Sequence, residues 1–295
     1  MGIFDDAGAN VLIQGITGRA ASRHARHMMD YGTNVVAGVA PGRAGRIVDG
    51  IPVFDTIAAA VEATGATTSV AFLPTGAVGD GLAEAAEAGI RLTVCLTEGV
   101  PLHDVVSGLE AAREAGMRVI GPNCPGMVSA GRYLLGFLPV ERMPVGGTAV
   151  LSRSGTLSYE AVHALGNGGL GVSLWIGVGG DRVKGSCFAD LLPDVLADER
   201  TDSLVLLGEI GGTDEEDLAE LLRDDDLPVV ALLAGSSAPE GVSLGHAGAI
   251  VEGGRGTYKA KRASLEAVGV DVVTRPSDIP AKILAKRPTA AATRG

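Results

Sequence analysis

Aromatic residues are scarce in this chain, and long apolar runs are absent. Only 3% of the residues are Phe, Trp or Tyr, whereas 46% are hydrophobic and 44 are glycine. This composition is typical of an α/β protein whose core packs small aliphatic side chains and whose tight turns use glycine. No apolar run approaches the roughly 20 residues of a transmembrane helix, so we expect no membrane partner. A length of 295 residues predicts about two domains.

Cysteine, basic charge and targeting signals are also in short supply. Three widely spaced cysteines without a C-x-x-C pair argue against a disulfide framework or a zinc site, and we expect no metal site in this chain. The first residues have neither the basic nor the apolar part of a signal peptide, so we expect a cytoplasmic protein. The net charge of −11 argues against non-specific nucleic-acid binding.

The first half of the chain alternates short apolar segments with helical stretches, which predicts a parallel sheet. Residues 11–14 read as a buried strand, and the turn from Gly15 to Ala21 opens a helix that extends to about Tyr31. A strand, a glycine-rich turn and a helix N-terminus together form an anion site. The G-x-x-G-x-x-A spacing is a degenerate dinucleotide fingerprint, so a tight turn without a ligand stays an equal alternative.

A second predicted strand, residues 34–39, is followed by Arg43 and Arg46, where an NAD-binding unit would carry an acid. Two arginines favour a nucleotide with an extra phosphate, such as coenzyme A or NADP, although solvated loop charges are the alternative. A later strand, 92–99, ends in polar residues. Because ligands on parallel sheets bind beyond the carboxyl ends of strands, we expect Thr17, Arg43 and Thr97 to share one rim.

The second half repeats this pattern, and we place the domain boundary within Gly121–Gly126, so that the domains are 1–123 and 124–295. Three loops at strand ends carry reactive groups: the turn around Ser154, the strand end at Glu209, and His246, which glycines flank. If these loops meet at one rim, Glu209 can hold one imidazole nitrogen and leave the other as a nucleophile beside a phosphate. The alternative is a loop histidine with no task.

Four segments, in this order, resemble the α subunit of succinyl-CoA synthetase, the NDP-forming succinate–CoA ligase. They are Gly-Pro-Asn-Cys-Pro-Gly at 121–126, Ser-Arg-Ser-Gly-Thr-Leu-Ser-Tyr-Glu at 152–160, Gly-Glu-Ile-Gly-Gly at 208–212, and Gly-His-Ala-Gly-Ala-Ile at 245–250. The resemblance covers nearly the whole chain. It implies an α/β protein with an N-terminal Rossmann-like CoA-binding domain and a flavodoxin-like parallel-sheet domain.

The resemblance also implies the roles of individual residues. His246 is expected to be phosphorylated during turnover, held by Glu209 and by the phosphate-binding turn Ser154-Gly155-Thr156, and Tyr159 matches a substrate-binding position. Coenzyme A is expected to bind at the first glycine-rich turn, at a basic residue and at a strand end: Thr17, Gly18, Arg19, Ala20, Arg43, Leu96, Thr97 and Glu98.

The implied reaction belongs to the tricarboxylic acid cycle and is reversible: succinate, CoA and NTP give succinyl-CoA, NDP and phosphate. An acyl phosphate forms, phosphate passes between the acyl group and His246, and the CoA thiol takes the acyl group. NTP and Mg²⁺ are expected on an ATP-grasp β subunit, since no P-loop occurs in this chain. The α chain alone is therefore expected to be incomplete as an enzyme.

The first glycine-rich turn departs from the family pattern. Arg19-Ala20-Ala21 stands where the family has a small or basic residue followed by Gln-Gly, and the Ala21 methyl makes close approach of a pyrophosphate harder. The acid therefore stays open: a paralogous ligase for another dicarboxylate, such as malate, is one alternative. A non-catalytic CoA-binding regulatory protein is another, and an NADP-dependent oxidoreductase is a third. His24 and His27, on the first helix, are expected at the surface or in packing.

Overall fold

The chain forms two compact units in the computed structural model, which describes residues 3–237, 246–251 and 256–287. Unit 1 comprises Met1–Leu138 and Ile176–Cys187, and unit 2 comprises Pro139–Trp175 and Phe188–Gly295. Unit 1 thus continues past residue 123 and takes up a later segment. The division into functional domains at 123/124 stays a prediction. Within the described residues, no helix is long and apolar enough to cross a membrane.

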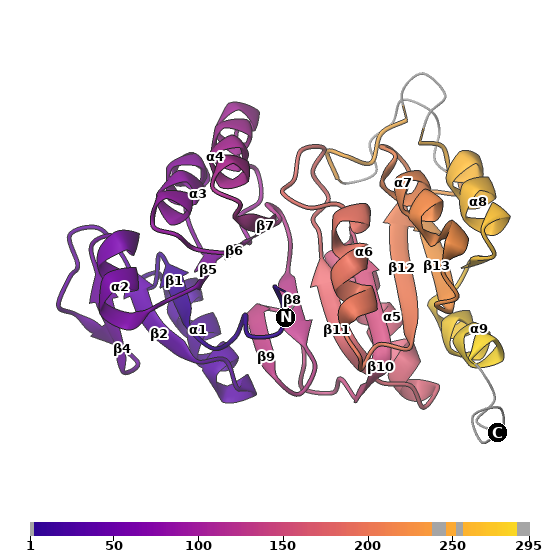
Figure 1. Ribbon diagram of the computed structural model, residues 1–295, viewed down its shortest axis with the longest axis horizontal. Helices are drawn as coiled ribbons and strands as arrows, with labels where there is room; N and C mark the ends of the chain where they lie inside the picture. The colour runs from indigo at the N-terminus through magenta and orange to yellow at the C-terminus, as the bar shows by residue number, and fades with distance from the viewer. Residues whose placement is uncertain (1–2, 238–245, 252–255, 288–295) are drawn as a thin grey trace. The chain divides into compact units, whose positions relative to one another are not determined.

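Unit 1 contains a seven-stranded sheet in the order β3-β4-β2-β1-β5-β6-β7 (Figure 1). Every pairing is parallel except that of β3 with β4, which closes one edge. An antiparallel hairpin, β8 with β9, follows in the chain. The strands are β1 Val11–Gln14, β2 Val35–Val39, β3 Ile47–Val48, β4 Ile51–Phe54, β5 Thr68–Ala71, β6 Leu92–Cys95, β7 Arg118–Ile120, β8 Gly126–Ser129 and β9 Tyr133–Gly136.

The order of the first sheet creates a crevice next to β1. The chain moves from β1 to β2 on one side and returns through β4 to β5 on the other, so the loops after β1 and β5 diverge. In an open α/β sheet, this change of direction is where ligands bind, outside the carboxyl ends of the strands. All four residues of β1 and of β5 are buried, because helices cover both faces of the sheet.

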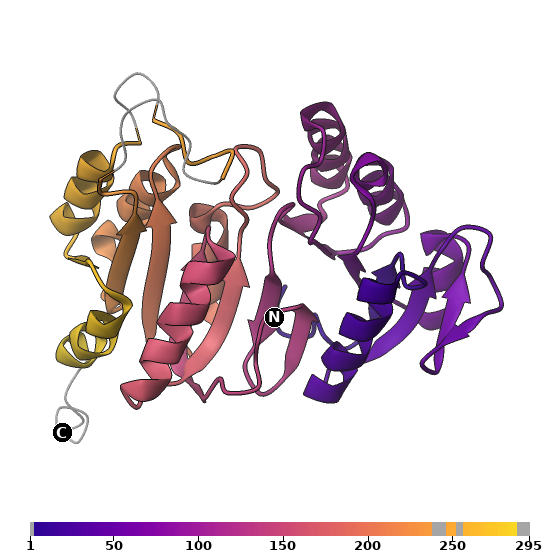
Figure 2. The ribbon, with the colours of Figure 1, turned by 180° about the vertical axis from the view of Figure 1, so that it is seen from behind.

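Helices cover both faces of the first sheet. Helix α1 lies on one face, and α2, α3 and α4 lie on the other (Figures 1 and 2). A cluster of buried aliphatic residues, among them Leu12, Ile57 and Leu82, forms the core beneath α2 to α4. The helices are α1 Arg19–Tyr31, α2 Ile57–Thr64, α3 Val78–Glu87, which a 3₁₀ turn at Thr75–Ala77 precedes, and α4 Leu102–Glu114.

Unit 2 is built on strands in the order β14-β13-β12-β10-β11. The chain again reverses direction, here between β10 and β12, and β10, β12, β13 and β14 pair in parallel. This is the flavodoxin-like strand order, with its ligand crevice at the carboxyl ends of β10 and β12. The strands are β10 Val145–Ser152, β11 Val172–Gly177, β12 Ser203–Glu209, β13 Val229–Ala234 and β14 Asp271–Val273.

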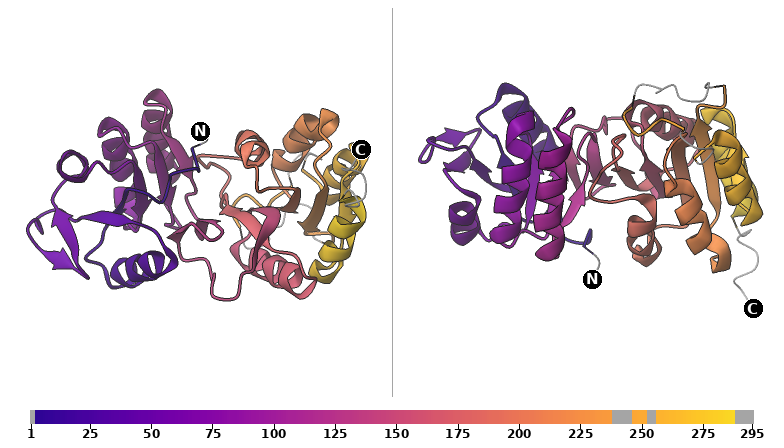
Figure 3. Two further views of the ribbon diagram at one scale, coloured as in Figure 1. Left: turned by 60° about the horizontal axis from the view of Figure 1, so that its bottom comes forward. Right: turned by 90° about the horizontal axis from the view of Figure 1, so that it is seen from above.

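Helices sandwich the second sheet as well. Helices α6, α7 and α8 lie on one face, and α5 and α9 lie on the other (Figures 2 and 3). Strand β12 is buried along its whole length, as expected for a central strand between two helical layers. The helices are α5 Gly155–Asn167, α6 Phe188–Ala197, α7 Asp214–Leu221, α8 Tyr258–Ala267 and α9 Ile279–Lys286, with 3₁₀ turns at Leu222–Asp224 and Pro276–Asp278.

Several elements of the structure were absent from the sequence-based expectation. Two of these elements, β4 and α6, contain a proline. Pro52 lies inside β4, next to the edge of the sheet, and Pro193 lies inside α6. Proline removes a backbone donor and normally argues against a strand or a helix interior. The hairpin of β8 and β9 is bounded by Gly126 and Gly136, both at positive φ, in a stretch to which the sequence analysis assigned no strand.

Candidate functional site

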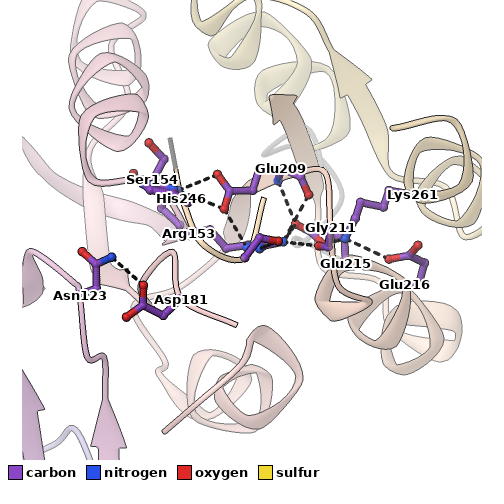
Figure 4. Close-up of polar contacts among 12 residues, drawn as sticks. Asn123, Arg153, Ser154, Asp181, Glu209, Gly211, Glu215, Glu216, His246 and Lys261 are labelled. Carbon is purple, nitrogen blue, oxygen red and sulfur yellow. Dashed lines mark hydrogen bonds and ion pairs between the residues drawn. The ribbon is translucent and has the colours of Figure 1, made fainter. Parts of the chain in front are cut away.

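His246 and Glu209 are in direct contact in unit 2. Glu209 is the last residue of β12, and His246 follows β13. The imidazole Nδ1 lies 2.9 Å from Oε2 and 3.1 Å from Oε1 of Glu209 (Figure 4). The His246 side chain is 28% exposed and that of Glu209 is 6% exposed, so a ligand can reach the ring but not its partner. Because a carboxylate only accepts hydrogen bonds, this contact favours the tautomer with its proton on Nδ1.

Arg153 lies beneath this pair and binds both segments that carry it. Its Nε forms an ion pair with Oε1 of Glu209 at 3.2 Å, and its side chain is 2% exposed. Nη1 donates to the carbonyl oxygens of Gly211, at 2.6 Å, and of Glu209, at 3.3 Å. Nη2 donates to the carbonyl oxygen of Gly248, two residues after His246, at 3.1 Å. One guanidinium therefore connects the end of β12 to the histidine loop (Figure 4).

A second buried cation, Lys261 on α8, supports the end of β12 from the other side. Its Nζ pairs with Oε2 of Glu215 and lies 3.2 Å from Oε2 of Glu216, both on α7. The other oxygen of Glu215, Oε1, accepts the backbone N–H of Glu209 at 3.0 Å. Lys261 and Glu215 are completely buried. Burial raises the pKa of Glu216, while the charge of Lys261 acts in the opposite direction.

The turn after β10 supplies a helix N-terminus at the same edge of the sheet. Ser154 is the N-cap of α5, and its Oγ accepts the N–H of Leu157 at 3.3 Å. Oγ of Ser152 donates to the Ser154 carbonyl and accepts the Ser154 N–H, which fixes the turn. The N–H groups of Gly155 and Thr156 belong to the first helical turn, where backbone donors have no intrahelical acceptor and attract anions.

Tyr159 lies one turn into α5 and packs against the edge of Trp175, with ring centroids 5.7 Å apart and planes at 81°. Burial raises the pKa of the Tyr159 phenol, so the hydroxyl is neutral and can donate at physiological pH. Trp175 is fully buried. The ring of Tyr159 is therefore held by packing while its position on α5 keeps it near the turn at Ser154.

Unit 1 has a cavity of about 480 Å³ at the crevice between the loops after β1 and β5. It contains five of the eight residues expected to bind coenzyme A, together with Ala21. Thr97, at the rim, donates from Oγ1 to the Leu73 carbonyl oxygen at 2.7 Å, which ties the loops after β5 and β6 together. The lining residues are Gly18, Arg19, Ala20, Ala21, His24, Phe72, Leu73, Leu96, Thr97 and Phe137.

Three expected CoA-binding residues lie outside that lining. Thr17 and Glu98 are exposed, in the loops after β1 and β6. Arg43 is exposed in the loop after β2, where Oδ1 of Asp55 accepts its backbone N–H at 2.8 Å. All three follow parallel strands at their carboxyl ends, so they share the edge of the sheet at which the cavity opens. Gly245, which precedes His246, lies outside the described residues.

Comparison with known proteins decides the family. Residues 6–99 match the CoA binding domain, and residues 151–270 match CoA-ligase. The α subunit 2 of ADP-forming succinate–CoA ligase from Archaeoglobus fulgidus is 45% identical over 279 residues, 95% of this chain and 97% of the relative. The α subunit of the same ligase from Staphylococcus aureus is 43% identical over 280 residues, 95% of this chain and 93% of the relative.

The chain belongs to the succinate–CoA ligase α-subunit family. This confirms the predicted family, its class as a ligase and the α/β fold in which a CoA-binding domain precedes a CoA-ligase domain. A solved structure of ATP citrate lyase from Methanothrix soehngenii, in complex with citrate and coenzyme A, has a TM-score of 0.85 and 24% identity. It covers 95% of this chain, which spans about half of that longer chain, 50%, so the likeness concerns the fold alone.

Sequence reasoning missed the residues that support the ligase-family histidine from below. Arg153 belongs to the family segment at 152–160, but the sequence analysis assigned it no role. Lys261 and Glu215 were not identified as candidate site residues. No local pattern distinguishes a completely buried lysine from a solvated one in an amphipathic helix. His24 was expected at the surface or in packing. It is half-buried, stacks on Phe72 with centroids 5.9 Å apart, and lines the unit 1 cavity.

Proposed function

We propose that this chain is the α subunit of an NDP-forming acid–CoA ligase that converts succinate, CoA and NTP to succinyl-CoA, NDP and phosphate, reversibly, through a phosphohistidine at His246. The contact of Nδ1 with the Glu209 carboxylate, in a chain of the succinate–CoA ligase α-subunit family, carries this proposal. The relatives' names support succinate as the acid. Their designation as α subunits supports a β partner, which we propose is an ATP-grasp protein holding NTP.

The first proposed step is phosphorylation of His246. Nε2, on the opposite side of the ring from the Glu209 contact, attacks the γ-phosphorus of NTP; the bond from phosphorus to the bridging oxygen breaks, and NDP leaves. The proton stays on Nδ1, donated to Glu209, which stabilises the positive charge that develops on the ring. On the partner subunit, Mg²⁺ would neutralise phosphate charge. The N–H groups of Gly155 and Thr156, with Ser154, would hold the phosphoryl oxygens.

The remaining proposed steps move the phosphoryl group to the acid and then release it. A carboxylate oxygen of succinate attacks phosphorus, the P–N bond breaks, and an acyl phosphate forms. The CoA sulfur then attacks the acyl carbon, a C–S bond forms, inorganic phosphate leaves, and the thiol proton passes to solvent. Tyr159, on the same helix as the phosphate-binding turn, would contact the succinate. A covalent carrier replaces one difficult step with easier ones.

Coenzyme A would occupy the cavity of unit 1. The lining combines apolar side chains with the N-terminus of α1, and that pairing suits a pantetheine arm and a pyrophosphate. Arg19 adds a positive charge at the N-terminus of α1, and Arg43 would bind a further phosphate as a fork-shaped donor. Thr17, Gly18, Ala20, Leu96, Thr97 and Glu98 would complete the contacts.

Reconstitution with the β subunit tests this function. The full chain, its β partner, Mg²⁺ and NTP are supplied with CoA and each of several acids, with succinate and malate compared directly. We expect CoA thioester formation with succinate and its complete loss in His246→Asn. His163→Asn, which changes an exposed histidine on α5, is the matched control and should keep full activity. Equal activity of the two variants would refute the proposal, and a preference for malate would change the acid.

A further inference from the structure

A network of charged side chains lies beneath the His246–Glu209 pair and is almost completely shielded from solvent. Arg153, Glu215 and Lys261 have exposed fractions of 2%, 0% and 0%. Burying ionised groups is costly unless each one is paired and hydrogen-bonded. Here Arg153 pairs with Glu209, and Lys261 pairs with Glu215. A fold that needed only a stable core could use apolar residues of similar volume in these positions.

Arg153 contacts two segments: the end of β12, which carries Glu209, and the loop that carries His246. The relative position of these segments determines the distance from the Glu209 carboxylate to the imidazole. Two of its nitrogens reach the β12 end, through the Glu209 carboxylate and the Gly211 carbonyl, and the third reaches the Gly248 carbonyl in the histidine loop. Backbone packing is equally tight there: a Cβ on Gly211 would lie 2.1 Å from the Gly248 oxygen. The guanidinium therefore sets the separation between the carboxylate and the loop that carries the ring.

The Lys261–Glu215 pair holds the same strand end through the backbone of Glu209. Oε1 of Glu215 accepts the Glu209 N–H, and it also lies 3.6 Å from Nη1 of Arg153. A Cβ on Gly208 would lie 2.4 Å from that oxygen, so the carboxylate packs directly on the β12 backbone. Glu215 thus joins Lys261 to Arg153, and the backbone of Glu209 is held from one side while its carboxylate is held from the other (Figure 4).

We propose that Arg153 is a positioning residue for the phosphorylation of His246, with Lys261 and Glu215 as its anchor. It holds the Glu209 carboxylate and the histidine loop at the separation that keeps Nδ1 bonded and Nε2 directed at phosphorus. The inference rests on the function proposed above and adds a residue that never touches the substrate. Lysine cannot replace arginine here, because all three donors of an ammonium group lie on one nitrogen. The planar guanidinium spreads its donors over three nitrogens, so that it can reach a carboxylate and two separate carbonyl groups.

The effect of losing the guanidinium should appear in the chemical step. A reacting group displaced by about 1 Å can lose about 100-fold in rate. For Arg153→Lys, which keeps the buried charge, we expect phosphorylation of His246 to be about 10- to 100-fold slower in a single turnover. The KM for NTP should not change, because its binding groups are proposed on the β subunit. CoA affinity should not change either, because the CoA cavity is lined by other residues.

The experiment uses the full chain reconstituted with its β subunit. Phosphorylation of His246 from γ-labelled NTP is followed by rapid quench in wild type, Arg153→Lys and Arg153→Gln. Arg200→Gln is the matched control. Arg200 pairs with Asp198 in the same unit, and both residues precede β12, so they lie at the opposite end of that strand from Glu209. The fluorescence of Trp175 reports whether unit 2 is folded in each variant.

The outcomes separate this inference from the function on which it rests. A wild-type complex that never labels His246 overturns the proposed function itself. The positioning role is supported if His246 is labelled in the wild type and is labelled slowly in folded Arg153→Lys, with an unchanged KM for NTP. Labelling of Arg153→Lys at the rate of wild type and Arg200→Gln overturns it. A change in KM for NTP with an unchanged rate constant also overturns it, because a positioning residue acts on the chemical step.

Discussion

Replacing Lys261 by methionine should destabilise unit 2 far more than a surface lysine substitution does. The change removes the positive charge from a site where Lys261 and Glu215 are both completely buried, and it leaves the Glu215 and Glu216 carboxylates facing each other. Removing one member of a buried ion pair costs about 3–5 kcal/mol, because the other charge remains buried and unpaired. In Lys261→Met, Glu215 keeps a second cation, since Nη1 of Arg153 lies 3.6 Å from its Oε1, and methionine fills most of the lysine volume. We therefore expect a loss near the lower end, about 3 kcal/mol.

Urea unfolding followed by Trp175 fluorescence measures this loss. Trp175 is the only tryptophan of the chain, is fully buried and belongs to unit 2, so its emission reports on that unit. Lys282→Met is the matched control, since Lys282 is 51% exposed and 3.5 Å from Asp271, and an exposed pair is worth about 0–1 kcal/mol.

A double substitution shows whether the loss comes from the Glu215 carboxylate that has lost Lys261. Lys261→Met combined with Glu215→Gln should recover about 1–2 kcal/mol of the loss, because the two side chains interact directly. If Lys261→Met is no more destabilising than Lys282→Met, the buried ion pair is not what holds α8, α7 and the end of β12 together. The support that we assign to Glu209 would then have to come from elsewhere.

Three further outcomes follow from the geometry. Gly211→Ala should abolish phosphorylation of the histidine, because its Cβ would lie 2.1 Å from a carbonyl oxygen of the histidine loop, whereas Gly212→Ala, with open space around it, should cost only about 1 kcal/mol of unfolding free energy. Arg19→Ala should weaken CoA binding in calorimetry by about 5-fold, and Arg23→Ala, on the same helix but outside the cavity lining, should not. Burial, and then neighbouring positive charges, lower the pKa of His24, so the unfolded chain binds a proton at His24 more readily than the folded chain does. The free energy of unfolding should therefore fall as pH decreases through about 6.5. In urea titrations, His24→Asn should reduce this dependence of stability on pH.

The sequence predicted the edge of each sheet at which chemistry is concentrated, and the structure brings the expected groups there. In a parallel sheet, the loops that follow the strands lie at the same edge. Because Glu209 ends one predicted strand and His246 lies in the loop after the next, their sequence positions predicted that the two side chains meet. The same logic brought Gly18 and Thr97 to one cavity of unit 1. Whether these groups bind phosphate and CoA stays a prediction, because periodicity and spacing determine location and not occupancy.

What the sequence could not predict was the side-chain packing below the surface. A guanidinium that connects two distant segments, as that of Arg153 does, depends on tertiary distances that no local pattern contains. A lysine in an amphipathic helix is normally solvated, so the complete burial of Lys261 was outside the reach of periodicity. Proline at positions 52 and 193 gave misleading local signals, since tertiary packing overrode the usual preference against proline in strands and helices.

The measurement that most directly tests the account is peptide mapping of the phosphorylated chain. The full chain and its β subunit are incubated with NTP and Mg²⁺, the acid is withheld, and the digest is analysed under alkaline conditions, in which phosphohistidine survives. We predict one acid-labile phosphate on the peptide that contains His246, strongly reduced in Glu209→Gln and unchanged in His163→Asn. Phosphate on another residue, or labelling of His246 at full rate in Glu209→Gln, would contradict the central claim that the carboxylate prepares this histidine for phosphoryl transfer.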